Sequence, residues 1–248
     1  MSITTIIRGR AERKPRILVY GEQKIGKTTF PSKAANPVYL GPEDGAPHLD
    51  VARFPSPGNW PNFISQVDWL IKNDHDHQTV VVDTLDALEP LLWRHLCDLH
   101  NKRSIEDFGY GKGYELALDS WRPFIALLET LNKKMTVVLL AHQMNRTVPN
   151  VEGDDYERTE LKLHKKASAL FLEWVDVIGF ACRQVRVKDK ECKVKSVGER
   201  ELRTGNTPAL VTGSRWAIPE SLPLEWGDFK QALANAGAFG APKKEQAA

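Results

Sequence analysis

An eight-residue stretch at positions 21–28, Gly-Glu-Gln-Lys-Ile-Gly-Lys-Thr, constrains the fold more than any other feature of this chain. It matches the phosphate-loop pattern GxxxxGK[ST] and directly follows a short apolar run at residues 17–20. The glycines allow backbone N–H groups to point at phosphates, and a helix that begins after the loop adds a favourable dipole. The pattern therefore predicts a strand, a phosphate-binding loop and a helix in an α/β fold that binds a nucleoside triphosphate.

Roles for single residues follow from the mechanics of such loops. The lysine reaches the β- and γ-phosphates and the hydroxyl ligates Mg²⁺, so Lys27 is a candidate catalytic residue and Thr28 a candidate metal ligand. We expect the Lys27 side chain to face solvent when no nucleotide is bound. The expected nucleotide-binding residues are Gly21, Glu22, Gln23, Lys24, Ile25, Gly26, Lys27, Thr28 and Thr29.

A second part of the site is expected at Asp83, which follows a β-branched run at residues 79–82. An acid that ends such a strand matches the Walker B role, in which it holds a Mg²⁺-bound water beside the loop hydroxyl. The segment from Asp83 to Asp86 lacks the DxxG pattern of GTPases, and no Asn-Lys-x-Asp guanine-reading motif occurs in the chain. We therefore expect ATP and Mg²⁺ as cofactors.

Apolar patterning beyond the loop alternates between strand and helix. Continuous apolar runs predict strands at residues 37–40, 79–83 and 135–141. Apolar residues at helical spacing predict helices at residues 62–73, 85–99 and 116–131. This alternation predicts a mainly parallel sheet flanked by helices, with β-hairpins in the C-terminal third. We divide the chain into an N-terminal segment (1–15), an ATPase core (16–237) and a disordered tail (238–248).

Composition narrows the function only slightly. Lys and Arg number 34 against 32 Asp and Glu, so the formal net charge of +2 does not indicate a nucleic-acid partner. No apolar stretch reaches the length of a membrane span, and residues 1–10 lack the apolar core of a signal peptide. We expect an intracellular protein without a membrane partner.

The carboxylate that activates the attacking water requires a separate argument. AAA+ motor ATPases carry Glu directly after the Walker B acid, where this chain has Thr84. Glu43 is the candidate instead, because it lies just past the strand predicted at residues 37–40. If that strand neighbours the phosphate-loop strand, its carboxyl end opens onto the same crevice. The alternative is that Glu43 belongs to an ordinary polar loop.

The order of these features resembles the RecA/recombinase ATPase core. The matching segments are residues 38–43, 80–88 and 139–143, the last of which reads Leu-Leu-Ala-His-Gln. The resemblance implies that Glu43 polarises the attacking water and that Gln143 is a catalytic residue that senses the γ-phosphate. His142 departs from the pattern, since bacterial RecA has Asn there.

The closer resemblance is to the core-only RecA-like ATPases of bacteriophages, which act as single-strand annealing or recombination proteins. Residues 108–114 and 163–168 also resemble segments of that group. The resemblance implies a phage-encoded ATPase that works as a homo-oligomeric ring or filament in the cytoplasm of a bacterial host. The implied partners are single-stranded DNA and also a single-stranded-DNA-binding protein.

Two loops are candidate DNA contacts in that arrangement. The first, at residues 101–114, alternates glycines with aromatic and basic side chains that suit base stacking and phosphate contact. The second, at residues 145–164, is acidic in its middle, so we expect contacts near its two ends. The alternatives are tyrosines that pack on the domain and lysines that are merely solvated. The candidates are Tyr110, Lys112, Tyr114, Arg146, Lys165 and Lys166.

Basic side chains also gather at residues 8–16 and 183–203. These segments suit three roles, which the sequence does not separate. They can follow a nucleic-acid backbone, protect an edge hairpin from stray pairing, or act on the γ-phosphate of a neighbouring subunit.

The favoured function is ATP-dependent binding and annealing of single-stranded DNA. A nucleotide or small-molecule kinase would share the phosphate loop, but it should show an arginine-rich lid and no pairing of Glu43 with Gln143. A nucleotide-gated scaffold with little turnover is the third hypothesis, and no residue excludes it.

Overall fold

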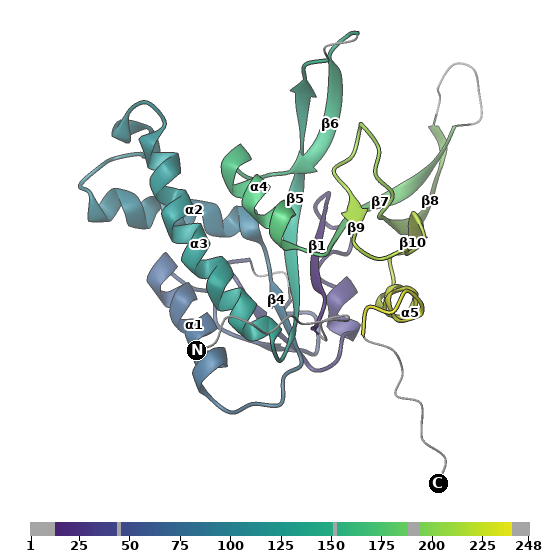
Figure 1. Ribbon diagram of the computed structural model, residues 1–248, viewed down its shortest axis with the longest axis horizontal. Coiled ribbons are helices and arrows are strands. Elements are labelled where there is room, and N and C mark those ends of the chain that lie inside the picture. Colours follow the sequence, from purple (N-terminus) through teal and green to yellow (C-terminus); the bar gives the residue numbers. More distant parts are fainter. Residues whose placement is uncertain (1–12, 44–45, 151–152, 188–193, 240–248) are drawn as a thin grey trace, which may run out of the picture.

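The apolar, β-branched runs of the sequence form the centre of a sheet that is covered on both faces (Figure 1). The computed structural model describes residues 13–43, 46–150, 153–187 and 194–239. The strands are β1 (Arg16–Gly21), β2 (Pro37–Leu40), β3 (Ala52–Arg53), β4 (Thr79–Val82), β5 (Thr136–Val148), β6 (Tyr156–Leu161), β7 (Val177–Val187), β8 (Val194–Arg203), β9 (Gly213–Ser214) and β10 (Ser221–Pro223). The α-helices are α1 (Trp60–Lys72), α2 (Leu85–Leu99), α3 (Lys112–Asn132), α4 (Lys165–Trp174) and α5 (Trp226–Asn235), with 3-10 helices η1 (Phe30–Lys33) and η2 (Ile105–Phe108).

The sheet follows the order β10-β8-β7-β1-β5-β4-β2-β3. The strands from β7 to β3 run parallel to one another, whereas β8 and β10 add antiparallel at one edge. Parallel strands bring their carboxyl ends to the same edge of a sheet, so the loops that follow β1, β2 and β4 meet there, where the parallel part of β5 ends. The predicted α/β class, with a mainly parallel sheet and a C-terminal hairpin, is confirmed.

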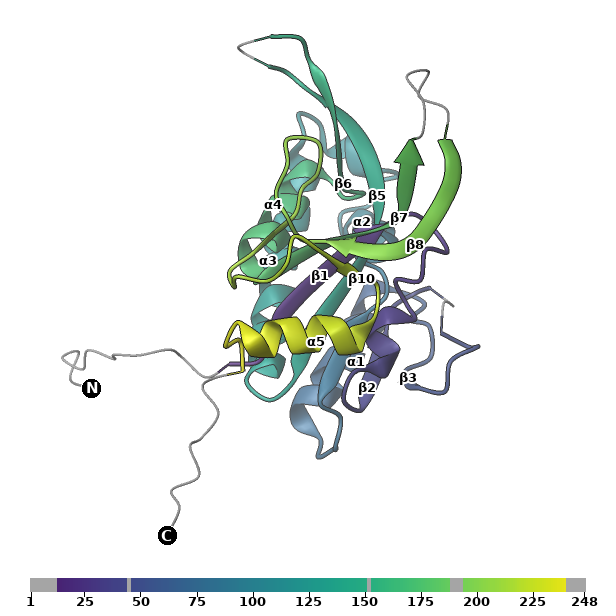
Figure 2. The ribbon, with the colours of Figure 1, turned by 90° about the vertical axis from the view of Figure 1, so that its right-hand side faces the viewer.

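Two hydrophobic layers enclose the sheet. One packs α1, α2, α3 and α4 on a single face, with Phe63, Trp121 and Phe171 fully buried. The other places η1 and α5 on the opposite face, where the rings of Phe30 and Phe229 pack edge to face. Figure 2 shows α5 in front of the sheet and the helical layer behind it. Since successive strand residues point to opposite faces of the sheet, neighbouring residues of a strand join different layers.

The prediction of a helix directly after the phosphate loop is wrong. The chain forms only the four-residue η1 there and turns into extended backbone at Ala34. Pro31 has no N–H to donate, and β2 already begins at Pro37. No full α-helix therefore starts at this loop, and the loop itself must provide most of the N–H groups for phosphate.

Both predicted DNA loops are more ordered than expected. Residues 101–114 contain η2 and the first turn of α3, and Gly111 with φ 72° directly precedes that helix. Residues 145–164 form mainly a β-hairpin, because β5 continues to Val148 and pairs antiparallel with β6. This hairpin rises clear of the helical layer at the top of Figure 1.

The ends of the described chain pack against the core. The Arg13 side chain donates to Asp176 at 2.5 Å, and the Asn132 amide donates to the Lys14 carbonyl at 3.0 Å. Ala238 is buried beside α5. The remainder of the predicted N-terminal segment and tail, residues 1–12 and 240–248, lies outside the described residues. No helix in the described ranges is long and apolar enough to cross a membrane.

Asp176 ties the N-terminal segment to the start of β7. Its buried carboxylate accepts hydrogen bonds from the Arg16 guanidinium at 2.8 and 3.1 Å and from the Arg16 backbone N–H at 3.1 Å. Burial of a charge is costly unless it is paired and hydrogen-bonded. The register of the N-terminal segment on the sheet therefore depends on this ion pair.

Replacing Asp176 with Asn should lower the free energy of unfolding by about 3–5 kcal/mol, because the buried Arg16 loses its main charge partner. Urea denaturation followed by fluorescence measures this loss. The control is Asp119→Asn, which removes one partner of the exposed ion pair with Arg122 and should cost less than ~1 kcal/mol. Similar losses in both variants would contradict the assignment.

Candidate functional site

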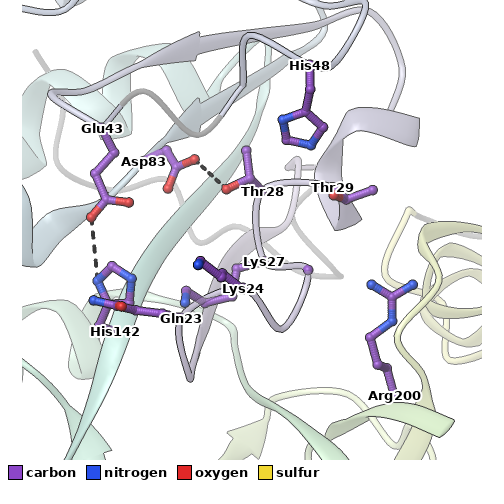
Figure 3. A pocket seen from close by; sticks show the side chains of 11 residues that line it. Gln23, Lys24, Lys27, Thr28, Thr29, Glu43, His48, Asp83, His142 and Arg200 are labelled. Atoms are coloured by element: carbon purple, nitrogen blue, oxygen red, sulfur yellow. Dashed lines mark hydrogen bonds and ion pairs between the residues drawn. The ribbon is translucent and has the colours of Figure 1, made fainter.

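The carboxyl ends of the central strands surround a cavity of about 500 Å³ (Figure 3). This volume lies within the range of sites that hold small ligands, ~300–1,000 Å³. The lining residues come from the phosphate loop, from the segments after β2 and β4, and from β5 and β8. They are Gln23, Lys24, Gly26, Lys27, Thr28, Thr29, Glu43, His48, Asp83, His142 and Arg200. The structure therefore brings most of the predicted loop residues together with Glu43 and Asp83.

The phosphate loop has the backbone of a ligand cradle. Gly26 has φ 112°, a value that favours glycine, and Lys24 is left-handed at φ 62°. The prediction that Lys27 faces solvent is wrong, because its Nζ donates to the carbonyls of Gly21 at 3.1 Å and Glu22 at 2.7 Å. Burial lowers the pKa of Lys27, and the neighbouring carboxylates oppose that shift. The ammonium group of Lys27 thus lies inside the loop and donates to backbone carbonyls, and phosphate oxygens can replace these carbonyls as its acceptors.

Thr28 and Asp83, the two residues predicted to hold Mg²⁺, are in direct contact. The Thr28 hydroxyl donates to Asp83 Oδ2 at 2.7 Å, and Asp83 Oδ1 is buried without a hydrogen-bond partner in the described part of the chain. Burial raises the pKa of Asp83 to about 6, against the hydrogen bond from Thr28. A buried carboxylate oxygen that lacks a donor, next to a loop hydroxyl, fits a hydrated Mg²⁺ ion.

Gly41 explains how Glu43 reaches this cavity. It has φ 138°, and a Cβ added there would lie 2.1 Å from the Asp83 carbonyl oxygen. Only glycine lets the chain after β2 pass so close to the chain after β4. The Thr84 hydroxyl then donates to Glu43 Oε1 at 3.0 Å, while the Glu43 side chain remains 32% exposed. Glu43 is therefore held in place and still reaches water.

His142 occupies the position beside Glu43. Its Nδ1 lies 2.9 Å from Asp86 Oδ2 and 3.5 Å from Glu43 Oε1, and its backbone N–H donates to Asp86 Oδ1 at 2.8 Å. Burial alone would raise the pKa of Asp86, but the hydrogen bonds from His142 hold it below the ordinary value. Asp86 on α2 thus fixes the imidazole at the edge of the cavity.

Gln143 lies outside the set of residues that line the cavity. Strand alternation accounts for this, since His142 shares a sheet face with Leu140 and the η1/α5 layer, whereas Gln143 shares the opposite face with Ala141. Gln143 Oε1 is buried without a hydrogen-bond partner in the residues that the structure describes. The predicted sensor residue therefore faces the helical layer.

Three cavity residues, His48, His142 and Arg200, were not among the predicted site residues. Arg200 belongs to β8, and its Nη1 lies 3.4 Å from the Ile25 carbonyl oxygen. In Figure 3 it stands on the opposite side of the phosphate loop from Glu43 and His142. No local motif marks Arg200, because its place at the cavity depends on the pairing of β8 with β7.

Two of the predicted DNA-contacting side chains form contacts within the protein, and the others are exposed. Tyr114 stacks on His164 with ring centroids 4.1 Å apart. Arg146 forms an ion pair with Glu160 and donates to the Leu163 carbonyl at 2.7 Å. These two side chains therefore stabilise the fold around the hairpin and the start of α4.

The other candidates are exposed. The relative accessibility of Tyr110 is 105%, and it follows Gly109 at φ 69° and precedes Gly111 at φ 72°. Because Tyr110 itself has φ 48°, three successive residues have a positive φ, and the ring projects from the surface at this turn. Exposed lysines lie nearby at Lys112, Lys165 and Lys166, the last of which forms an ion pair with Glu115.

Comparison with known proteins gives two similarities. A family described as "AAA domain" matches residues 13–216, a range that contains every residue lining the cavity. The SPbeta prophage-derived uncharacterized protein YorG of Bacillus subtilis (strain 168) is 29% identical over 138 residues. This alignment covers 51% of the chain and 40% of that relative, so the chain matches less than half of the relative's length.

Replacing Asp83 with Asn should stabilise the protein in the absence of nucleotide and metal. Folding raises the Asp83 pKa from 3.8 to about 6, so the folded state binds a proton more tightly and stability falls as pH rises through this interval. A neutral amide removes that cost. At pH 7.5 we expect a gain on the order of 3 kcal/mol in the free energy of unfolding.

Urea denaturation in EDTA at pH 4 and pH 7.5 tests this expectation. The gain from Asp83→Asn should shrink toward pH 4, where Asp83 is protonated in the folded protein. Asp119→Asn on the exposed face of α3 is the matched control and should show no such dependence. A variant that is less stable than wild type at pH 7.5 would contradict the role assigned to burial.

Proposed function

The chain belongs to the AAA domain family of P-loop NTPases, and on that premise we propose that it is a Mg²⁺-dependent ATPase that binds and anneals single-stranded DNA. One observation carries the hydrolytic part of this proposal. Glu43 opens onto the same cavity as the Thr28–Asp83 pair, although it follows a different strand. A carboxylate beside a phosphate loop and beside two residues suited to hold Mg²⁺ is the arrangement that hydrolysis of a terminal phosphate requires.

Each residue has one expected task. Lys27 leaves the carbonyls of its own loop and neutralises the β- and γ-phosphates. Thr28 would hold Mg²⁺ directly and Asp83 would hold it through water, and the ion would supply charge stabilisation at the phosphates. Glu43 accepts a proton from the attacking water, while the hydrogen bond from Thr84 fixes its carboxylate.

The exposed surface around Tyr110 supports the DNA-binding part. Its outward ring suits base stacking, and Lys112 and Lys165 begin α3 and α4 without a carboxylate partner among the described residues. The stacking of Tyr114 on His164 and the Lys166–Glu115 ion pair join the starts of these two helices. Aromatic and basic groups thus lie side by side on one surface.

Helix α2 connects this surface with the nucleotide cavity. On its first turn, Asp86 binds His142 at the cavity. One turn later, the buried Glu89 accepts the His164 backbone N–H with both oxygens, at 3.0 and 3.1 Å. A change in the position of His142 on nucleotide binding would therefore reach the start of α4 through α2, which carries both carboxylates.

The proposal includes a bacteriophage origin, for which the prophage-derived relative is support. It also includes assembly into a homo-oligomeric ring or filament, cooperation with a single-stranded-DNA-binding protein, and a sensor role for Gln143 that requires this residue to turn toward the cavity. The two other hypotheses, a kinase and a nucleotide-gated scaffold, become outcomes of the experiments below.

Glu43→Gln should lower the single-turnover rate of ATP hydrolysis by about 10²–10⁴-fold, because loss of a positioned general base has that effect. ATP affinity should stay near wild type, since the amide keeps an oxygen that accepts the Thr84 hydrogen bond. Glu173→Gln makes the same change on the exposed end of α4 and serves as the control. Unchanged hydrolysis in Glu43→Gln would refute this role of Glu43, and no turnover in wild type would favour the scaffold.

Single-stranded DNA should bind with steep salt dependence and should stimulate ATP turnover. Joint replacement of Lys165 and Lys166 by Ala should reduce the slope of log affinity against log salt by about 1.4, since each phosphate contact contributes about 0.7. ATP affinity should not change.

The matched control replaces Lys133 and Lys134, two adjacent exposed lysines directly after α3, far along that helix from Tyr110. Tyr110→Ala should weaken DNA binding without a change in the salt slope, because stacking releases no counterions. Absence of DNA binding with ATP present, together with phosphate transfer to a small acceptor, would favour the kinase hypothesis instead.

A further inference from the structure

Arg200 is the one arginine that lines the nucleotide cavity in the described part of the chain, and it comes from β8, which joins the parallel part of the sheet as an antiparallel strand. Its Nη1 lies 3.4 Å from the Ile25 carbonyl oxygen in the middle of the phosphate loop. A Cβ added at Gly26 would lie 2.7 Å from the same nitrogen. The guanidinium therefore approaches the loop backbone closely.

The sheet register explains this position. Leu202 and its cross-strand partner Ala181 belong to the hydrophobic layer that contains Ile25. Arg200 lies two residues before Leu202, so its side chain leaves the same face of the sheet. The exposed guanidinium stands at the rim of the cavity rather than in open solvent above the hairpin.

A second arginine strengthens the case for an anion at this rim. Arg183 on β7 lies directly opposite Arg200 in the antiparallel ladder, which sends both side chains to one face. Like charges in that relation are destabilising unless something neutralises them. Neither arginine has a carboxylate partner within the described residues, whereas Arg203 on the same strand pairs with Glu201 at 2.6 Å.

We propose that Arg200 binds the α- and β-phosphates of the nucleotide within its own subunit. This inference rests on the proposed function and names a residue of the same site. Glu43 and His142 mark the opposite side of the loop, where the γ-phosphate must meet the attacking water. Arg200 faces the other side, next to Ile25 and Gly26, and so reaches the diphosphate part that ATP and ADP share.

Equilibrium binding of ATP and of ADP to Arg200→Ala, with steady-state hydrolysis, tests this assignment. A charge-assisted hydrogen bond to phosphate predicts that both affinities fall by about 10–100-fold. KM should rise to a similar extent, whereas kcat should stay within about twofold of wild type, because the interaction is the same in ground and transition states. Arg200→Lys should recover part of the affinity, since it keeps the charge but loses the planar fork.

Arg203→Ala is the matched control, because it removes the same charge from the same strand on the opposite sheet face. It should leave nucleotide affinity unchanged. Unaltered affinity in Arg200→Ala would overturn the proposal, as would a loss of kcat with normal ADP binding, which would assign Arg200 to the γ-phosphate. If wild type itself bound neither nucleotide, the proposed function would fail and this inference with it. If wild type binds nucleotide normally, an unaltered affinity in Arg200→Ala contradicts only the role of Arg200 and leaves the proposed function in place.

Discussion

The hydrogen bond between the Thr28 hydroxyl and the Asp83 carboxylate is the contact on which the rest of the site depends. It joins the ends of β1 and β4, which are not neighbours, since β5 lies between them in the sheet. The two loops must therefore meet above the end of the parallel part of β5, and this is where His142 lies. The other residues that line the cavity lie around this contact between the phosphate loop and the segment after β4.

Charge is divided across the cavity. The carboxylates of Glu43 and Asp83 line one side, and His142 contacts Glu43 there and Asp86 on α2. Lys27 lies in the middle, buried among its own loop carbonyls, and Arg200 stands on the far side. Such a gradient suits an elongated polyanion with a metal ion near one end, because each charge of the ligand meets its opposite.

Helix α2 is both a structural and a functional element. Its apolar residues pack in the helical layer, while its polar residues Asp86 and Glu89, on adjacent turns, hold two separate backbone segments. The hydrogen bond to His142 fixes the end of the parallel part of β5. The bonds to His164 fix the start of α4, beside the surface that carries Tyr110 and the exposed lysines. Helix α2 can therefore couple the position of His142 at the cavity to the position of the start of α4.

The sequence by itself determined the fold class, the phosphate loop and the two acids Glu43 and Asp83. These follow from local patterns, because a parallel strand ends where its apolar run ends and the next residues point into the shared crevice. Only the tertiary structure decided which residue of the pair His142 and Gln143 faces the cavity. The continuation of β5 beyond the sheet was not visible in the apolar pattern, so its side-chain alternation could not be assigned.

The same reason explains the remaining differences. The second predicted DNA loop became a hairpin because cross-strand pairing with β6 orders its polar residues, and such pairing leaves no apolar signal in the chain. Arg200 was one basic residue among many in residues 183–203. It reaches the phosphate loop because β7 pairs with β1 and β8 pairs with β7, a chain of contacts set by sheet order and not by any neighbouring sequence.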